Sequence, residues 1–302
     1  MNETMLYALL KKDIRSVANK MYKFKDAAYL FCQNHRLDEI EQMNVSESKS
    51  FYYTFQGCAE LTSIPQLDTS NGTNFVGMFK ECLELTSIPQ LDTSNGTSFS
   101  SMFYRCGKLT SIPQLDTSNG TNFERMFYNC TSITSIPQLD TSNGTYFTSM
   151  FDGCNSITSI PQLDTSNGTN FAKMFNGCGK LISIPKINLY KATNVNQIFY
   201  NCRSLTNLYL YNINVSITIG SGTSYGHLLT VDSLVHTIKE LCKVNSTTTL
   251  TIGPTNLKKI TSLYCKVIDA STEKIDMELC DSTEDGAITL KEYAKMKNWT
   301  IQ

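Results

Sequence analysis

The sequence has little of what marks a membrane-spanning, nucleic-acid-binding or catalytic chain. It has no apolar run near the ~20 residues that a membrane helix needs, and its charged residues, 18% of the total, leave a net charge of −1. Such a balance argues against a protein that grips nucleic acid or anionic lipid. It has three histidines, none beside a nucleophile and a carboxylate in a known arrangement, and neither a glycine-rich phosphate loop nor a His-Glu-x-x-His motif. We therefore predict no catalysis, no cofactor, no resident metal, no nucleic-acid partner and no membrane insertion.

The first 26 residues lack the basic start and the continuous apolar stretch of a secretory signal. The chain would then stay in the cell that made it, leave by another route, or have lost a signal beforehand. Apolar side chains recur in this segment at helical spacing: Met5, Leu6, Leu9, Leu10, Ile14, Val17 and Met21. We predict a capping helix over residues 1–26, with a docking or oligomerising helix as the alternative.

Eleven cysteines are present, but their spacing does not indicate a disulfide framework. Seven of them recur every 24 residues: Cys58, Cys82, Cys106, Cys130, Cys154, Cys178 and Cys202. A strict period indicates one repeated structural position, and stacked side chains of one position point in parallel into the core. We expect a ladder of reduced, buried thiols that pack as small hydrophobes. Disulfides could not pair all seven, and a metal would need converging ligands.

The units that begin at these cysteines are near-identical. The unit from Cys82 reads CLELTSIPQLDTSNGTSFSSMFYR, and the unit before it and the three after it match at most positions. Fourteen of the fifteen phenylalanines occupy two columns of the repeat. One unit cannot bury its apolar face alone, but stacked units share a continuous core. We predict an α/β solenoid of about eight coils over residues 27–225, with coils separated by about 4.8 Å.

Each unit carries three local signals. Leu85–Ile88 is short and β-prone, so we predict a strand that Pro89 ends or places at an edge. Asp92–Gly96 has turn chemistry, because Asx side chains bond the local backbone and glycine supplies positive φ. Phe99–Phe103 has apolar residues at i, i+3 and i+4, which predicts one helical turn.

The motif C-x-x-L-T-S-I followed by F-x-x-M-F resembles the BspA-like leucine-rich repeats of bacterial surface proteins. The D-T-S-N-G-T-x-F-x-x-M-F stretch is also similar to a related surface-lipoprotein repeat. The resemblance covers about two-thirds of the chain. It implies a leucine-rich-repeat-like fold and an adhesive or interaction module without a catalytic site.

The C-terminal segments LTVDSLVHTIKELC, TTTLTIGPTNLKKI and DGAITLKEYAKMKNWTIQ resemble a terminal module of prophage-encoded structural proteins, although no tail-fibre shaft is present. We predict a small α+β domain over residues 226–302, serving as a cap or as an attachment point to a larger assembly. Its expected elements are a helix capped by Thr230, a strand over Thr249–Ile252, a helix with a capping box of Thr289 and Glu292, and a closing strand over Trp299–Ile301.

Five aspartates form another column: Asp68, Asp92, Asp116, Asp140 and Asp164. We expect each to accept backbone N–H bonds within its own turn. Ca²⁺ between coils is the alternative, which one acid per unit makes unfavourable. The Asn-Gly-Thr sequences match the N-glycosylation pattern, but Asn-Gly turns explain them better.

Two sets of surface residues are candidate binding groups. One set is constant and would form polar rows able to match a repetitive ligand such as a glycan, or would simply be solvated: Thr86, Ser87, Gln90, Thr110, Ser111, Gln114, Thr134, Ser135 and Gln138. The other set varies between units and contains tyrosines, which are frequent at interfaces, although a tolerant surface can also be idle: Tyr104, Tyr128 and Tyr146.

The sequence thus predicts a non-catalytic binding or adhesion protein that recognises a protein or glycan on a cell surface. Virion or cell-surface association is favoured, including a phage tail-associated receptor-binding role and contacts with other virion or surface proteins. The alternative is a structural scaffold whose repeats only space its two ends.

Overall fold

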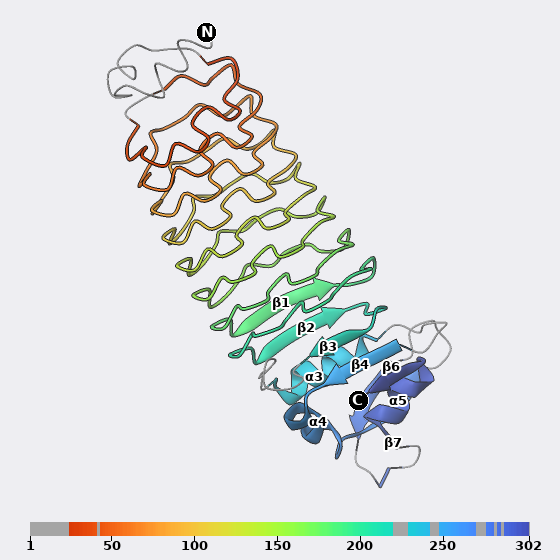
Figure 1. Cartoon of the computed structure of the whole chain (residues 1–302). Coiled ribbons are helices and arrows are strands. Elements are labelled where there is room, and N and C mark those ends of the chain that lie inside the picture. The colour runs from red at the N-terminus through yellow and green to blue at the C-terminus, as the bar shows by residue number, and fades with distance from the viewer. Residues whose placement is uncertain are drawn as a thin grey trace.

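The computed structural model describes residues 24–40, 43–219, 229–241, 248–269, 276–280, 283–284 and 287–301. It is an elongated stack of coils that ends, at the C-terminus, in a group of short helices and strands (Figure 1). The predicted N-terminal helix lies outside the described residues except at positions 24–26, which are not helical.

Backbone hydrogen bonds join each coil to the next at intervals of one sequence repeat. The N–H of Thr97 donates to the carbonyl of Thr73 at 3.0 Å, and the N–H of Thr121 donates to the carbonyl of Thr97 at 3.0 Å. The same relation appears as parallel bridges from Asn74 to Ser98 and from Ser98 to Asn122. The chain is therefore a repeat solenoid, as the sequence predicted.

Two columns of phenylalanine run through the interior of the stack. Phe99 stacks on Phe123 with ring centroids 5.9 Å apart, and Phe103 stacks on Phe127 at 5.6 Å, with near-parallel planes in both pairs. All four side chains are fully buried. Offset stacking of this kind is a favourable arrangement of aromatic rings, and it lets one side chain fill the same space in every coil.

The segment from Phe99 to Cys106 forms consecutive tight turns and not the helical turn that its apolar spacing predicted. The N–H of Met102 donates to the carbonyl of Phe99, whereas the N–H groups of Phe99, Ser101 and Phe103 donate to the next coil. Ser101 and Arg105 have φ of 57° and 59°, so each turn has a left-handed third residue, the feature of a type II turn. The helical prediction is wrong because alternate N–H groups are bonded between coils and cannot serve a helix.

The predicted strand is present only near the end of the stack and begins later than expected. β1 spans Ser183–Asn188, and β2 spans Asn207–Tyr211 in parallel with it. The earlier coils have proline at one position in both neighbours, and proline cannot donate to a ladder. Tyr209 stands one repeat after Pro185, so that this pair of coils can form two paired strands, with a register shift between Ile184 and Ile187.

Beyond β2 the stack continues into the C-terminal region. The N–H of Thr230 donates to the carbonyl of Thr206, and the N–H of Leu208 donates to Ser233 Oγ. One apolar core runs without a break from Ala27 to Ile301.

Among the described residues, the C-terminal elements comprise a parallel sheet in the order β3-β4-β8, a smaller antiparallel sheet in the order β6-β5-β7, and three helices. Thr230 caps α3, and Thr289 with Glu292 forms the capping box of α5, as the sequence predicted. The bounds are β3 Ile217–Ile219, α3 Val231–Lys239, β4 Thr248–Ile252, α4 Pro254–Ile260, β5 Tyr264–Asp269, β6 Asp276–Cys280, β7 Ile288–Thr289, α5 Leu290–Met296 and β8 Trp299–Ile301.

The left-handed turn positions generate a prediction about stability. We expect Ser101→Gly to stabilise the chain by about 0.5–1 kcal/mol, because relief of the steric strain at positive φ exceeds the added entropy of the unfolded chain. Gly77 already occupies this position one coil earlier, at φ 59°. Chemical denaturation monitored by circular dichroism measures the difference.

Ser100→Gly is the matched control at the neighbouring position, which lies outside the left-handed region. It should destabilise the chain by about 0.5–1 kcal/mol. Equal effects of the two substitutions would contradict this description of the turns.

Candidate functional site

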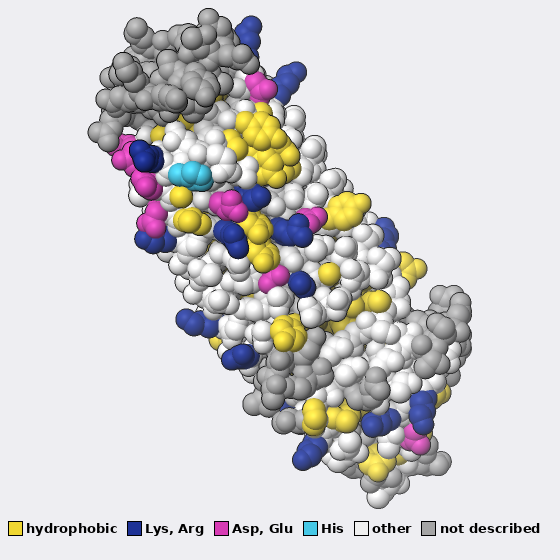
Figure 2. All heavy atoms as spheres, in the orientation of Figure 1, with side chains coloured by type: hydrophobic (Ala, Val, Ile, Leu, Met, Phe, Trp, Pro, Cys, Tyr) yellow, Lys and Arg dark blue, Asp and Glu magenta, His cyan; other side chains and the backbone are white. Residues whose placement is uncertain are grey.

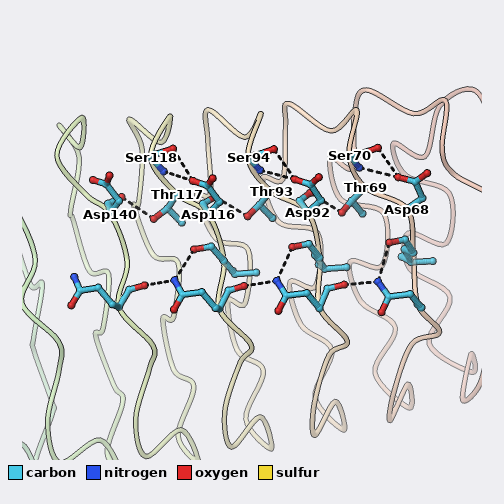
Figure 3. Close-up of a pocket in the computed structure, with 17 residues that line it drawn as sticks. Asp68, Thr69, Ser70, Asp92, Thr93, Ser94, Asp116, Thr117, Ser118 and Asp140 are labelled. Carbon is cyan, nitrogen blue, oxygen red and sulfur yellow. Dashed lines mark hydrogen bonds between the residues drawn. The ribbon is translucent and has the colours of Figure 1, made fainter.

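The glutamines of the constant set and the aspartate turns that follow them line an open groove that runs along the stack. It consists of two adjoining hollows of about 980 and 670 Å³, which share Gln138 and Asp140. Figure 3 shows the two rows that form it: carboxylates beside serine hydroxyls in one row, and glutamine amides in the other.

The glutamine row is a ladder between coils. Gln90 Nε2 donates to the carbonyl of Leu91 at 3.1 Å and to the carbonyl of Gln114 at 2.5 Å, and Gln114 Nε2 bonds Leu115 and Gln138 in the same way. Both amide hydrogens are therefore engaged within the protein. The glutamines that we predicted as ligand contacts can offer a ligand only their carbonyl oxygens.

Each aspartate of the column stabilises its own turn. Asp92 Oδ1 accepts hydrogen bonds from the Ser94 N–H at 3.0 Å and from Ser94 Oγ at 2.7 Å. These hydrogen bonds lower the pKa of the Asp92 carboxyl. The neighbouring threonine joins this turn to the next coil, because Thr93 Oγ1 donates to the carbonyl of Asp116 at 2.7 Å. In the part of the chain that the structure describes, no group of three or more acidic, histidine or cysteine side chains is arranged to hold a metal ion.

The asparagines of the Asn-Gly-Thr sequences are also bonded between coils. Asn95 Nδ2 donates to the carbonyl of Ser70 at 2.9 Å, and Asn119 Nδ2 donates to that of Ser94 at 2.8 Å. The side-chain donors of the groove thus serve the stack itself. Its outward chemistry is mainly that of acceptors.

The threonine and serine rows lie on the exposed side of the coil, beside the glutamines. Thr86, Ser87, Thr110 and Ser111 are exposed, as are their copies Thr134 and Ser135. Thr86 Oγ1 donates to the carbonyl of Thr62 at 3.3 Å. Ser111 makes no side-chain hydrogen bond with the described residues and is a suitable site for a neutral control substitution.

The seven cysteines of the repeat are buried, and none of them forms a disulfide. Cys106 Sγ donates to the carbonyl of Phe79 at 3.0 Å, and Cys130 Sγ donates to that of Phe103 at 2.9 Å. The same carbonyls accept the N–H of the cysteine in their own coil. Burial raises the pKa of Cys130 to about 12, which makes this thiol a poor nucleophile at neutral pH.

The variable residues bring aromatic side chains together over the first coils. We call this surface the tyrosine face and define it by Tyr29, Tyr52, Tyr53, Lys80, Tyr104, Arg105 and Tyr128. In Figure 2, hydrophobic side chains lie among basic and acidic ones over this N-terminal half of the stack. The turns with left-handed residues carry most of these side chains, in consecutive pairs of partly exposed positions such as Tyr52 with Tyr53 and Tyr104 with Arg105.

Three tyrosines cluster at the start of the tyrosine face. The ring centroids of Tyr52 and Tyr53 are 4.3 Å apart, and that of Tyr29 lies 5.2 Å from Tyr52. Tyr53 lies flat on the next coil, because a Cβ added to Gly77 would meet its ring at 2.1 Å. Burial, together with the neighbouring Tyr52, raises the pKa of Tyr53.

Lys80, Tyr104 and Tyr128 occupy one position in three successive coils. Tyr104 and Tyr128 stack with centroids 4.7 Å apart and planes 7° from parallel. Lys80 Nζ lies 5.2 Å from the ring centroid of Tyr104 and 5.6 Å from that of Tyr53. The ammonium group is thus held between two rings, an arrangement that cation–π attraction favours.

Of the tyrosines that the sequence singled out, the structure brings Tyr104 and Tyr128 together but not Tyr146. Tyr146 is half exposed and lies in the bridge between coils, paired with Asn122 and Asn170. Our prediction did not include Tyr29, Tyr52, Tyr53 or Lys80 among the site residues. Aligning the degenerate first units in register would have placed Tyr53 one repeat after Tyr29, and Lys80 one repeat before Tyr104.

The fold defines a parallel repeat solenoid that continues into a C-terminal group of short helices and strands. The chain belongs to the family DUF285, described as Mycoplasma protein of unknown function, whose model matches residues 24–135 and 110–213. No curated protein is detectably similar in sequence. No helix among the described residues has both the length and the apolar character for a membrane span.

Two solved structures share a limited likeness with the chain. A leucine-rich repeat protein of T. pallidum is 19% identical with a TM-score of 0.40, over 51% of this chain and 69% of that one. An internalin (inlF) from Listeria monocytogenes is 13% identical with a TM-score of 0.27, over 82% of this chain and 87% of that one.

The glutamine ladder generates a second prediction. We expect Gln114→Ala to lower the free energy of unfolding by about 1–2 kcal/mol, since two hydrogen bonds to neighbouring carbonyls are lost. Ser111→Ala, in the same coil, should change it by less than about 0.5 kcal/mol. Urea denaturation of the three chains measures both values, and a neutral Gln114→Ala would show that the ladder is incidental.

The buried thiols generate a prediction about pH. A thiol whose pKa rises on folding stabilises the protein below its unfolded pKa, and this stabilisation is lost as pH rises toward the folded pKa. For Cys130 that window runs from 9.0 to about 12. Cys130→Ala should therefore flatten the fall of unfolding free energy with pH by up to about 1.4 kcal/mol per pH unit within it.

The measurement is a series of denaturation curves between about pH 8 and pH 11, compared with those of the parent chain. The absolute stability of the variant also reflects lost packing, so the slope is the informative quantity. Parallel slopes for the two chains would mean that Cys130 ionises as readily in the fold as in the unfolded chain.

Proposed function

We propose that the chain is a non-catalytic binding protein that engages a macromolecular partner through the tyrosine face. The observation that carries the proposal is the exposure of a tyrosine cluster on a surface whose residues vary between otherwise identical coils. Tyr29 is 54% exposed, although it contacts two other rings. Tyrosine anchors are common at the centres of protein interfaces, because a rigid ring buries a large area at low entropic cost.

The groove is a weaker candidate for the binding surface, because its side chains hold the stack together. Its glutamines and threonines donate to backbone carbonyls of neighbouring coils, as do the asparagines of the same turns, so substitution there would disturb the stack. The side chains of the tyrosine face donate no hydrogen bonds of this kind between coils, since the intercoil bonds of their segment are made by backbone N–H groups. Residues on such a surface can change to suit a binding partner without disturbing the stack.

A rigid spacer is the second candidate function. It is favoured by the unbroken register of hydrogen bonds along the stack and by the single core that joins the repeats to the C-terminal elements. In that role the C-terminal region would attach the chain to a larger assembly. Placement of that assembly on a phage tail or a cell surface stays a prediction.

Array binding with matched variants tests the proposal. The full chain, labelled at its N-terminus, is applied to an array of extracellular proteins and to a glycan array. We expect Tyr104→Ser with Tyr128→Ser to weaken each specific signal at least about tenfold, since such anchors commonly contribute 1–2 kcal/mol or more each. Ser111→Ala with Ser135→Ala, in the exposed serine row beside the glutamines, should leave the signals unchanged.

Two other results would contradict the proposal. Loss of binding in the serine variant alone would transfer the binding role to the constant polar rows. Absence of specific signals on both arrays would favour the spacer. Circular dichroism melting curves of all variants verify that the fold is retained.

A further inference from the structure

Lys80 sits at the centre of the tyrosine face with an unusual set of neighbours. Its ammonium lies between the rings of Tyr53 and Tyr104, and its side chain is half-buried. The flanking rings restrict the ammonium group, so that its positive charge is held at one point on the surface.

The carboxylates near this position are engaged with other cations. Glu81 lies 3.8 Å from Arg105, and Glu84 lies 2.5 Å from Lys108. Among the residues that the structure describes, no carboxylate lies within ion-pair distance of Lys80. The tyrosine face therefore presents one preorganised positive charge without an acidic partner of its own.

The arrangement of the rings argues against a glycan as occupant. Sugars stack on exposed faces of aromatic rings, but Tyr128 covers one face of Tyr104 and Lys80 approaches the other. The Tyr53 ring lies on Gly77. What these rings offer outward is mainly their edges and hydroxyls, which suit the mixed polar and apolar surface of a polypeptide.

The distribution of charge argues against a nucleic acid. Nucleic-acid binding depends on several cations that neutralise successive phosphates. Here Glu81, Glu84 and Glu124 lie beside Arg105, Lys108 and Arg125 and would repel a polyanion. A single carboxylate of a polypeptide, in contrast, can approach Lys80 alone.

We propose that Lys80, held between Tyr53 and Tyr104, binds a carboxylate group of an acidic polypeptide segment of the partner. This inference rests on the proposed binding role of the tyrosine face and names the chemistry that the face selects. A charge-assisted hydrogen bond from the ammonium to a carboxylate is stronger than one between neutral groups. The edges of the flanking rings would contact the apolar residues beside it.

Calorimetric titration with two matched peptides tests the assignment. One 15-residue peptide repeats Asp-Phe-Ser, and its counterpart replaces each Asp by Asn. We expect the full chain to bind the acidic peptide at least about tenfold more tightly, with a preference that weakens as salt is raised. Lys80→Met keeps the packing of the side chain and removes its charge, and it should abolish the preference.

Lys108→Met is the matched control, because Lys108 is already paired with Glu84. It should retain the preference within about twofold. Chitohexaose and an oligothymidylate serve as glycan and nucleic-acid probes, and each should bind the parent chain more weakly than the acidic peptide.

The outcomes separate this inference from the proposed function. If the tyrosine variants lose array binding while Lys80→Met keeps the peptide preference, the binding face stands and the carboxylate assignment fails. The assignment also fails if neither peptide binds, if the two peptides bind equally, or if either of the other probes binds more tightly. Loss of the preference in Lys80→Met alone supports it.

Discussion

The buried phenylalanines of the stack pack against their own counterparts one coil away, and the rest of the structure depends on this self-contact. A residue type is acceptable in the core only if it packs well against itself. Phenylalanine meets this condition by offset stacking, as Phe99 does on Phe123. Cysteine meets it because its thiol donates to a carbonyl of the preceding coil, as Cys106 does to Phe79. A carboxylate cannot be repeated in this way without compensation, and the five aspartates of the repeated column accordingly lie exposed, outside the core, with serine donors beside them.

The period and the apolar columns of the sequence were sufficient to predict the solenoid and its interior, because burial follows directly from a repeated hydrophobic pattern. The local elements were less predictable. Phe99–Phe103 has helical spacing, yet its N–H groups alternate between the same coil and the next. The sequence pattern of one unit does not show which N–H groups bond within the coil and which bond the next coil, since this depends on the neighbouring coil. The left-handed positions could not be predicted from the sequence either, because Ser101, Arg105 and Gly77 occupy them and have no side-chain feature in common.

The candidate surfaces illustrate the same limit. The constant polar rows were located from sequence, but their role depends on hydrogen bonds that only stacking creates, as between Gln90 and Gln114. Tyr104 and Tyr128 were recognised because they stand in clear repeats. Tyr53 and Lys80 were not singled out, because one lies in a degenerate unit and the other is not aromatic. Their association across three coils is a property of the stack and not of any one unit.

The near-identity of successive coils has a consequence for how this molecule can change over generations. An interface between two coils in the middle of the stack presents the same Phe, Met and Cys contacts wherever it falls. Removing or adding one whole coil therefore leaves every remaining interface intact, whereas a change of a few residues would misalign all of them. The repeated coding sequence favours such unequal exchange, and each event would move the tyrosine face relative to the C-terminal end by about 4.8 Å. The distance between the tyrosine face and the C-terminal end can thus change in fixed steps, while the surfaces at both ends stay the same.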